Sequence, residues 1–407
     1  MLDKEVESLI IQEKKREQDY INLIPSENYA SQDILDATGS VFMNKYAEGY
    51  PKKRYYPGTE VVDELELLAI ERAKKLFNCQ FANVQALSGS MANEEIYFAL
   101  LQPGDHILSM NLIDGGHLSH GSKVSFAGKY FQIDHYYVDK ESELLDYDAI
   151  KELALKIKPK LIIAGASNYS RIINWQKFKE IASEVGAYLL ADISHISALV
   201  VTGLHPSPFP YADVVMTTMQ KQIRGPRGAI ILSNDPIIAK KIDSAVFPGM
   251  QGGPQENIIA AKAVAFYEAS LPSFKSYCEN VIKNNKALCQ VFLDHNYHVI
   301  GNGTDNHLFC VNVYQKCHQT GDVVEHWLEQ AHILANMNTV PYDQNKPMHP
   351  SGIRMGSPAM TTRNLNEQEF KQIGEWIVQI IDSNGDEQVI NQVKEQVRLL
   401  LKNHPIY

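Results

Sequence analysis

The sequence predicts an α/β fold with a mostly parallel sheet that is covered by helices, followed by a smaller α+β domain. Three observations lead to this prediction. Short apolar runs of strand length alternate with helical segments through the middle of the chain. These runs are apolar almost throughout, which is typical of parallel strands buried on both faces. After about residue 270, helical segments dominate instead.

The expected elements of the first part follow one another in order. One helical stripe is formed by Leu65, Leu68, Ala69, Leu76 and Phe77, and a second by Ile96, Ala99 and Leu100. Pro103-Gly104 ends the second helix. We expect strands at residues 81–84, 106–110, 160–164, 187–191 and 214–217, and a helix at residues 175–184.

The second part is expected to hold strands near residues 297–300 and 308–313. The last long helix should begin at Asn366, because Glu369 stands three residues later as in a capping box. One face of this helix carries Phe370, Ile373, Ile377 and Ile380. We therefore expect two domains: residues 1–270, with an N-terminal arm and the large domain, and residues 271–407, the small α+β domain.

Composition narrows the class of protein. The chain has 407 residues and a formal net charge of -10, which argues against nucleic acid or an anionic membrane as the main partner. Five cysteines without metal-ligand spacing predict reduced thiols and no metal site. Residues 1–18 are charged and unlike a signal peptide, and the most apolar stretch, residues 187–204, contains Asp192 and His195. We expect a cytoplasmic protein.

Ligands of such sheets bind beyond the carboxyl ends of the strands, and three expected strand exits carry informative residues. Ser88-Gly89-Ser90 precedes a helix, whose free N–H groups could bind a phosphate, although this pattern is more often a plain turn and cap. Asp192 ends an apolar strand, where a carboxylate needs a positive partner such as a protonated pyridine nitrogen. Without further context, a helix cap at Asp192 and a packed His195 are the simpler interpretation.

Two basic residues complete the candidate site. Lys221 follows the strand at 214–217 and is followed by Arg224-Gly225-Pro226-Arg227-Gly228, whose cations would lower its pKa as a Schiff-base amine requires. Arg354 could hold a substrate carboxylate through two parallel hydrogen bonds, although most arginines are surface residues. A phosphate cup, an acid, an amine and a carboxylate clamp are together what pyridoxal phosphate needs to act on an amino acid.

The sequence also resembles serine hydroxymethyltransferase, in order and spacing, from about Glu27 to Tyr407. The matching segments are Tyr46-Ala47-Glu48-Gly49-Tyr50-Pro51, Arg54-Tyr55-Tyr56, Asp114-Gly115-Gly116-His117-Leu118, Gly252-Gly253-Pro254 and Thr304-Asp305-Asn306-His307. The resemblance implies an aspartate-aminotransferase-like fold of type I, with a mostly parallel seven-stranded sheet in the large, cofactor-binding domain. It also implies a homodimer with active sites at the subunit interface.

The resemblance implies a role for each matching residue. The cofactor-binding set is Lys221, Ser88, Gly89, Ser90, His117, Ser167, Asp192, His195, Gly252 and Gly253. Lys221 would form the Schiff base, Asp192 would pair with the ring nitrogen, and His117 would stack on the ring. Glu48, from the partner subunit, would move the proton of the substrate hydroxyl, so that the implied catalytic residues are Lys221, Glu48, Asp192 and His117. The substrate- and folate-binding set is Ser26, Tyr46, Arg354, Glu48, Tyr55, Leu112, Leu118, Phe247 and Asn338.

The implied activity is the interconversion of serine and tetrahydrofolate with glycine and 5,10-methylenetetrahydrofolate. The chain departs from the family near the lysine, where Gln220 replaces the usual histidine and Met219 a threonine. After Gly252-Gly253-Pro254, Gln255-Glu256-Asn257 replaces the usual Leu-Met-His. Two alternatives therefore stay open. One is a paralogue with folate-independent aldolase or transaldolase activity on threonine-like or α-methyl amino acids, and the other is a catalytically poor binding protein, against which the intact Lys221 counts.

Overall fold

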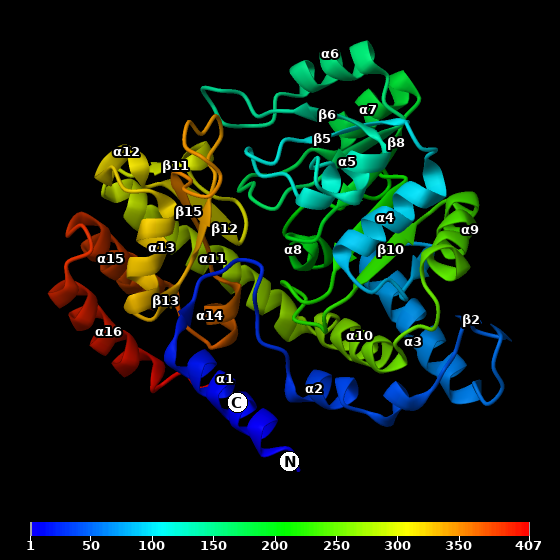
Figure 1. The fold of residues 1–407 in the computed structure, drawn as a ribbon, viewed down its shortest axis with the longest axis horizontal. Coiled ribbons are helices and arrows are strands. Elements are labelled where there is room, and N and C mark those ends of the chain that lie inside the picture. The colour runs from blue at the N-terminus through cyan, green and yellow to red at the C-terminus, as the bar shows by residue number, and fades with distance from the viewer. Residues whose placement is uncertain (1, 407) are drawn as a thin grey trace. The chain divides into compact units, whose positions relative to one another are not determined.

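Figure 1 shows the computed structural model of the protein, which describes residues 2–406. The chain packs as two compact units. One consists of residues 30–278, and the other combines residues 1–29 with residues 279–407. Helix α11 (Pro272–Asp294) contains the point at which the chain passes from the first unit to the second.

The unit of residues 30–278 is built on a seven-stranded sheet with the strand order β4-β10-β9-β8-β7-β5-β6. Its strands are β4 (Phe81–Asn83), β5 (His106–Met110), β6 (Gln132–Tyr136), β7 (Leu161–Ala164), β8 (Tyr188–Asp192), β9 (Val214–Thr218) and β10 (Ala229–Ser233). Only β10 runs against its neighbours. The expected mostly parallel sheet is therefore confirmed.

Helices cover this sheet, and a short hairpin lies beside it (Figure 1). The hairpin consists of β2 (Gly49–Tyr50) and β3 (Lys53–Arg54). The helices are α2 (Gln32–Thr38), η1 (Val41–Asn44), α3 (Glu60–Phe77), α4 (Gly89–Leu100), η2 (Leu118–His120), α5 (Phe126–Tyr130), α6 (Tyr147–Ile157), α7 (Trp175–Val185), α8 (Ser197–Val201), α9 (Pro236–Ser244), η3 (Ala245–Met250) and α10 (Glu256–Ala269). The apolar core joins α4 and α9 to the central strands.

Helix α3 is rotated relative to the expected stripe. Its buried residues are Val62, Glu66, Ala69, Ala73 and Phe77, whereas Leu68 is exposed. Two physical reasons account for the difference. The small side chains Ala69 and Ala73 let α10 approach closely, and Glu66 is drawn inward by a hydrogen bond from Arg54. An apolar stripe could not reveal a face that is centred on a buried carboxylate.

The second unit holds a four-stranded antiparallel sheet in the order β11-β12-β15-β14. Its strands are β11 (His298–Val299), β12 (Leu308–Asn312), β14 (Asn336–Asn338) and β15 (Gly352–Gly356), and a parallel pair is formed by β1 (Ile21–Asn22) and β13 (Ile333–Leu334). Its helices, besides the later part of α11, are α1 (Lys4–Asp19), η4 (Ile300–Asn302), α12 (Tyr314–Cys317), α13 (Gly321–Gln330), α14 (Pro358–Thr362), α15 (Glu367–Asp382) and α16 (Glu387–Leu401). One apolar core joins the sheet to α11, α13, α15 and α16.

The predicted capping box at the start of α15 is confirmed. The Asn366 side chain accepts hydrogen bonds from the N–H groups of Gln368 and Glu369, and the Glu369 carboxylate accepts one from the Asn366 N–H. The expectation that this helix is the last long one is wrong, because α16 follows it. Asp386 caps α16, and Ile390, Val393 and Val397 join the core.

Candidate active site

The carboxylate of Asp192 lies at the carboxyl end of β8 and is buried. Its Oδ2 atom is 2.8 Å from His120 Nε2 and accepts a hydrogen bond from Asn93 Nδ2 at 3.2 Å. Its Oδ1 atom accepts a hydrogen bond from the Ser194 N–H at 3.0 Å. Helix α8 begins only at Ser197, so Asp192 is not a helix cap.

Asp192 is held in its charged form. Burial by itself would raise its pKa, but the hydrogen bond from His120 and the positive charges of His120 and Lys221 outweigh burial and leave the pKa below its ordinary value. The positive charge of Lys221 is one of the causes that lower the pKa of Asp192, and the roles predicted for the two residues stay predictions. His195 lies three residues beyond the strand and is buried.

The first turn of α4 carries the three residues expected to form a phosphate cup. Ser88 is the N-cap, and its hydroxyl accepts a hydrogen bond from the Met91 N–H at 3.3 Å. Gly89 must lack a side chain, because a Cβ there would lie 2.6 Å from Cγ2 of Thr218. Ser88 and Ser90 are exposed, so their hydroxyl groups and the free N–H groups of this turn can reach a ligand.

Two loops beyond β5 and β7 hold the next predicted residues. The Ser167 N–H donates a hydrogen bond to the Gly115 carbonyl at 2.7 Å, which ties the two loops together. His117 caps η2, and its Nδ1 atom is 2.8 Å from the Ser119 hydroxyl. The His117 and His120 rings meet edge to face with centroids 5.6 Å apart, so the ring predicted to stack on the cofactor adjoins the partner of Asp192.

Lys221 is half-buried in the loop between β9 and β10. The Arg224 N–H donates a hydrogen bond to the Lys221 carbonyl at 3.2 Å. The Arg224 guanidinium lies over the Tyr277 ring, 4.5 Å from its centroid, and Arg227 is exposed. Neither observation demonstrates the expected crowding of Lys221 by two guanidiniums, which stays a prediction.

A second cluster gathers the residues expected to serve the partner subunit. A Cβ on Gly252 would lie 3.5 Å from Glu48 Oε1, and one on Gly253 would lie 2.9 Å from the Tyr46 ring. The four residues are thus neighbours within one chain. Gly253 is required here because a side chain would displace the Tyr46 ring, whereas a Cβ on Gly252 would make only an ordinary contact with Glu48.

Exposed apolar residues surround these clusters. The Tyr55 and Phe247 rings are 5.6 Å apart, and Tyr55 is 74% exposed. Leu112 and Leu118, the other predicted folate contacts of this unit, are 43% and 51% exposed. Apolar side chains this exposed are available to a flat aromatic ligand or to another subunit.

The remaining predicted residues belong to the other unit. Arg354 lies in β15, is buried, and donates from Nε to Asn336 Oδ1 at 3.2 Å. Burial lowers the pKa of Arg354 to about 10. Ser26 lies near the end of β15, since the Gly356 N–H donates to the Leu23 carbonyl at 2.8 Å, and Asn338 lies in β14.

Sequence reasoning missed the residues that hold the predicted ones in place. His120 and Asn93 hold Asp192, and Arg54 holds the chain around Glu48 through the carbonyl groups of Ala47 and Gly49. A signal was available only for Arg54, which lies in a segment that matches the family. The other two partners lie 72 and 99 positions from Asp192, and only the fold brings them together.

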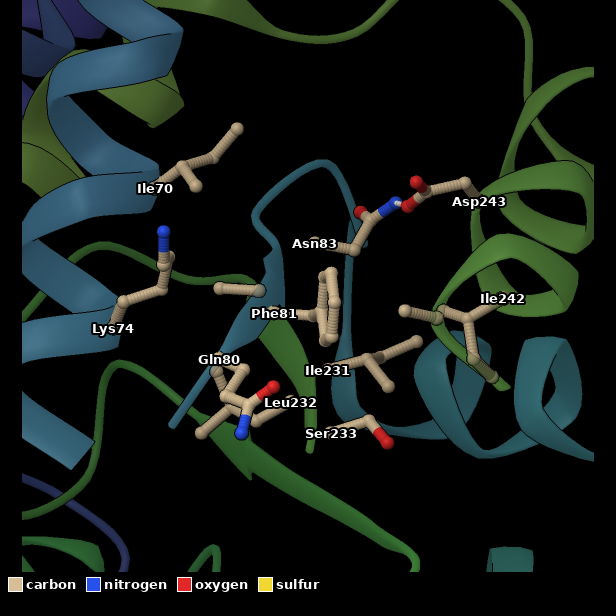
Figure 2. A pocket seen from close by; sticks show the side chains of 12 residues that line it. Ile70, Lys74, Gln80, Phe81, Asn83, Ile231, Leu232, Ser233, Ile242 and Asp243 are labelled. Carbon is tan, nitrogen blue, oxygen red and sulfur yellow. Dashed lines mark hydrogen bonds between the residues drawn. The ribbon is translucent and has the colours of Figure 1, made fainter. Parts of the chain in front are cut away.

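The unit of residues 30–278 also has a cavity of about 260 Å³, which lies between α3, α9 and the edge of the seven-stranded sheet (Figure 2). Apolar side chains dominate its lining, with Lys74 on one side and the hydrogen-bonded pair Asn83 and Asp243 on the other. None of the predicted site residues lines it. Across residues 2–406, no three histidine, cysteine or acidic side chains gather as metal ligands, and no helix has the length and apolarity to cross a membrane.

Comparison with known proteins identifies the family. The family model described as serine hydroxymethyltransferase matches residues 1–377. Three similar proteins, each called serine hydroxymethyltransferase, come from bacteria. The protein from Malacoplasma penetrans is 56% identical, covering 99% of this chain and 98% of the relative. Those from Mycoplasma pneumoniae (51%; 100% and 99% covered) and Legionella pneumophila (52%; 98% and 95% covered) are nearly as similar.

Proposed function

Because this chain belongs to the serine hydroxymethyltransferase family, we propose a role in that reaction for each residue of the candidate site. The chain is a pyridoxal-phosphate-dependent one-carbon transferase of fold type I, which interconverts serine and tetrahydrofolate with glycine and 5,10-methylenetetrahydrofolate. Its substrates are small molecules. The observation that carries the assignment of roles is the buried Asp192 carboxylate at the end of β8, which His120, Asn93 and the Ser194 N–H hold in place.

The residues present fit pyridoxal phosphate. A charged carboxylate at the end of β8 can accept a hydrogen bond from a protonated ring nitrogen, and Lys221 supplies the amine that holds the aldehyde carbon. A Cβ at Gly89 would press against Thr218, and the exposed Ser88 and Ser90 leave the first turn of α4 accessible to the phosphate group. When bound, the cofactor withdraws electron density from the substrate Cα, so that the bond to the hydroxymethyl carbon can break.

We assign the remaining cofactor contacts from the match of these residues to the family. His117 packs against the ring, Ser167 and His195 lie toward its phenolic oxygen, and Ser88 and Ser90 bind the phosphate. The partner subunit's Gly252 and Gly253 complete the phosphate site. His120 and Asn93 position Asp192 and keep it charged.

Arg354 binds the substrate carboxylate, with Ser26 beside it. A guanidinium forms two parallel hydrogen bonds with a carboxylate, which fixes the orientation of the amino acid. The partner subunit's Tyr46 assists this contact. The partner subunit's Glu48 takes and returns the proton of the substrate hydroxyl, which a carboxylate can do from hydrogen-bonding distance. Tyr55, Leu112, Leu118, Phe247 and Asn338 contact the folate.

We propose that the active form is a homodimer. Tyr46, Glu48, Gly252 and Gly253 are neighbours within one chain, as a group that serves the partner's site should be. Large apolar side chains near this group are exposed, including Val41 at 78% and Val61 at 65%, and a second copy would cover them. We also propose two domains, residues 1–270 (an N-terminal arm and the large domain) and residues 271–407 (the small domain); the arm, residues 1–29, packs in the same compact unit as residues 279–407. We further propose a cytoplasmic location, as expected of the bacterial relatives.

The test is glycine formation from serine, with and without tetrahydrofolate, in the protein purified with its cofactor. We expect strong folate dependence, and a visible absorption band that Lys221→Ala removes. Lys241→Ala, at another lysine of the same unit, should leave both unchanged. Equal rates on threonine or phenylserine without folate would support the aldolase alternative instead, and a band that survives Lys221→Ala would disprove the role of Lys221.

A further inference from the structure

Arg54 holds the backbone on both sides of Glu48. Its Nη1 atom donates hydrogen bonds to the Ala47 carbonyl at 2.8 Å and the Gly49 carbonyl at 3.0 Å. The Tyr55 N–H donates to the carbonyl of Glu48 itself at 3.0 Å. Three consecutive carbonyl groups are thus fixed, so the direction of the Glu48 side chain depends on Arg54.

Acidic and amide groups orient Arg54 in turn. Its Nε atom donates to Asp63 at 2.8 Å and its Nη2 atom to Glu66 at 2.6 Å. Gln85 Nε2 donates one hydrogen bond to the Glu66 carboxylate, at 2.8 Å, and another to the Gly49 carbonyl, at 3.0 Å. The Arg54 side chain is 2% exposed, so water cannot replace these partners.

Glu256 is a third carboxyl group beside Arg54, in the position where the family usually has methionine. Its side chain is fully buried at the start of α10, and its Oε1 atom is 3.8 Å from Arg54 Nη1. Within residues 2–406, neither oxygen of Glu256 has a hydrogen-bond partner. A buried acid in this condition is expected to keep its proton.

The surroundings support a neutral Glu256. Burial raises the pKa of Glu256 to about 8, and the negative charges of Glu66 and Asp63 raise it while Arg54 lowers it. Two other elements, α2 and η1, pack against α10. Helix α2 has its acidic residues, Asp33 and Asp36, exposed to solvent, and η1 carries no charged side chain.

We propose that Glu256 is a positioning residue whose charge determines how firmly Arg54 holds Glu48, which makes serine turnover depend on pH. Nη1 has two hydrogens, and the Ala47 and Gly49 carbonyls use both. Neutral Glu256 leaves these bonds intact. Charged Glu256 attracts the same nitrogen, which can approach it only by releasing a carbonyl beside Glu48. This inference rests on the proposed role of Glu48.

The test compares two reactions of the holoenzyme between pH 7 and pH 9. Serine turnover with tetrahydrofolate needs Glu48, and cleavage of phenylserine does not, which Glu48→Gln verifies. In the unmodified protein, the ratio of the two kcat values should fall about fivefold as the pH rises, which is a modest coupling between sites. The KM for serine should change little, because Glu48 is displaced rather than the carboxylate site.

Two variants test whether the charge of Glu256 causes this pH dependence. Glu256→Gln copies the neutral acid, and Glu256→Met restores the residue usual in the family, so one remains if the other folds poorly. We expect the ratio to change less than about twofold over this pH range in both. A fall as large as in the unmodified protein would overturn the proposal. Loss of serine turnover at every pH in the unmodified protein would contradict the proposed function instead.

Unfolding by urea tests the charge of Glu256 independently of any activity assay. Because folding raises the pKa of Glu256, its contribution is fully present below about pH 4.5 and is lost as the pH rises through about 8. From pH 6 to pH 9 the unmodified protein should therefore lose stability relative to Glu256→Gln. Parallel stability curves for the two proteins would overturn the proposal, whatever the assays show.

Discussion

Individual buried charges in this protein are held by partners from distant parts of the chain. Asp192 is the clearest case, because three donors surround its carboxylate and His120 makes the shortest contact. Folding lowers the pKa of Asp192, so its contribution to stability is present above its unfolded pKa of about 4. That contribution is lost only as the pH falls through the lower folded value.

Removing His120 should leave the buried Asp192 without its strongest partner. We expect His120→Ala to cost about 3 kcal/mol in the free energy of unfolding at pH 7, measured by urea denaturation. This cost should be smaller at pH 3. Without His120, the Asp192 carboxylate takes up a proton at a higher pH than it does in the unmodified protein, so the variant no longer buries an unpaired charge. The cofactor should also be retained less well.

A surface pair is the matched control for this variant. His106 Nδ1 is 3.4 Å from Asp134 in a pair that is more than one-third exposed on both sides. His106→Ala should cost less than about 0.5 kcal/mol. Equal costs for the two histidine variants would show that His120 contributes no more than an ordinary surface pair.

At the scale of elements, α10 is joined to the sheet by one lysine. Lys262 Nζ donates hydrogen bonds to the carbonyls of Val84, Ala86 and Ala229, at distances of 2.6 Å to 3.0 Å. These carbonyls lie just beyond β4 and at the start of β10, next to the loop that leads into the phosphate cup. The lysine therefore holds two strand ends and a helix in one arrangement.

Lys262→Met keeps the apolar part of the side chain but leaves three buried carbonyl groups without this donor. We expect a loss of about 3 to 5 kcal/mol in the free energy of unfolding, measured by urea denaturation. Lys151→Met is the control, because the Lys151 pair with Glu184 is about 45% exposed and should contribute far less to stability. A small effect at Lys262 would mean that water or a shift of α10 satisfies the carbonyls.

At the scale of the whole molecule, the proposed homodimer makes a prediction that a monomeric site does not. If each site combines Lys221 of one subunit with Glu48 of the other, mixing the inactive variants Lys221→Ala and Glu48→Gln should restore serine turnover. Each mixed dimer has one site with both residues intact. Random exchange makes half of the dimers mixed, so about a quarter of the normal activity should return.

The control is a mixture of either variant with a protein that carries both substitutions. No dimer in that mixture has an intact site, so it should stay inactive. Failure of the two single variants to complement each other, with subunit exchange confirmed by differently tagged chains, would place Lys221 and Glu48 in sites within one subunit.

The sequence by itself determined the alternation of strands and helices, the capping box at Asn366, and the family to which the chain belongs. These features depend on neighbouring residues: apolar periods, local caps and contiguous motifs are all written along the chain. The family in turn implied the cofactor and the reaction. Periodicity was misleading where the buried face of a helix is polar, as at Glu66 in α3.

Only the tertiary structure decided which side chains act on the motif residues. His120 meets Asp192 across 72 positions, and Glu256 lies beside Arg54 although about 200 residues separate them. Charges and hydrogen bonds act through space, and in a buried, low-dielectric site the nearest partner sets the charge of a group. No local pattern encodes such a distance, because the fold of the whole chain creates it.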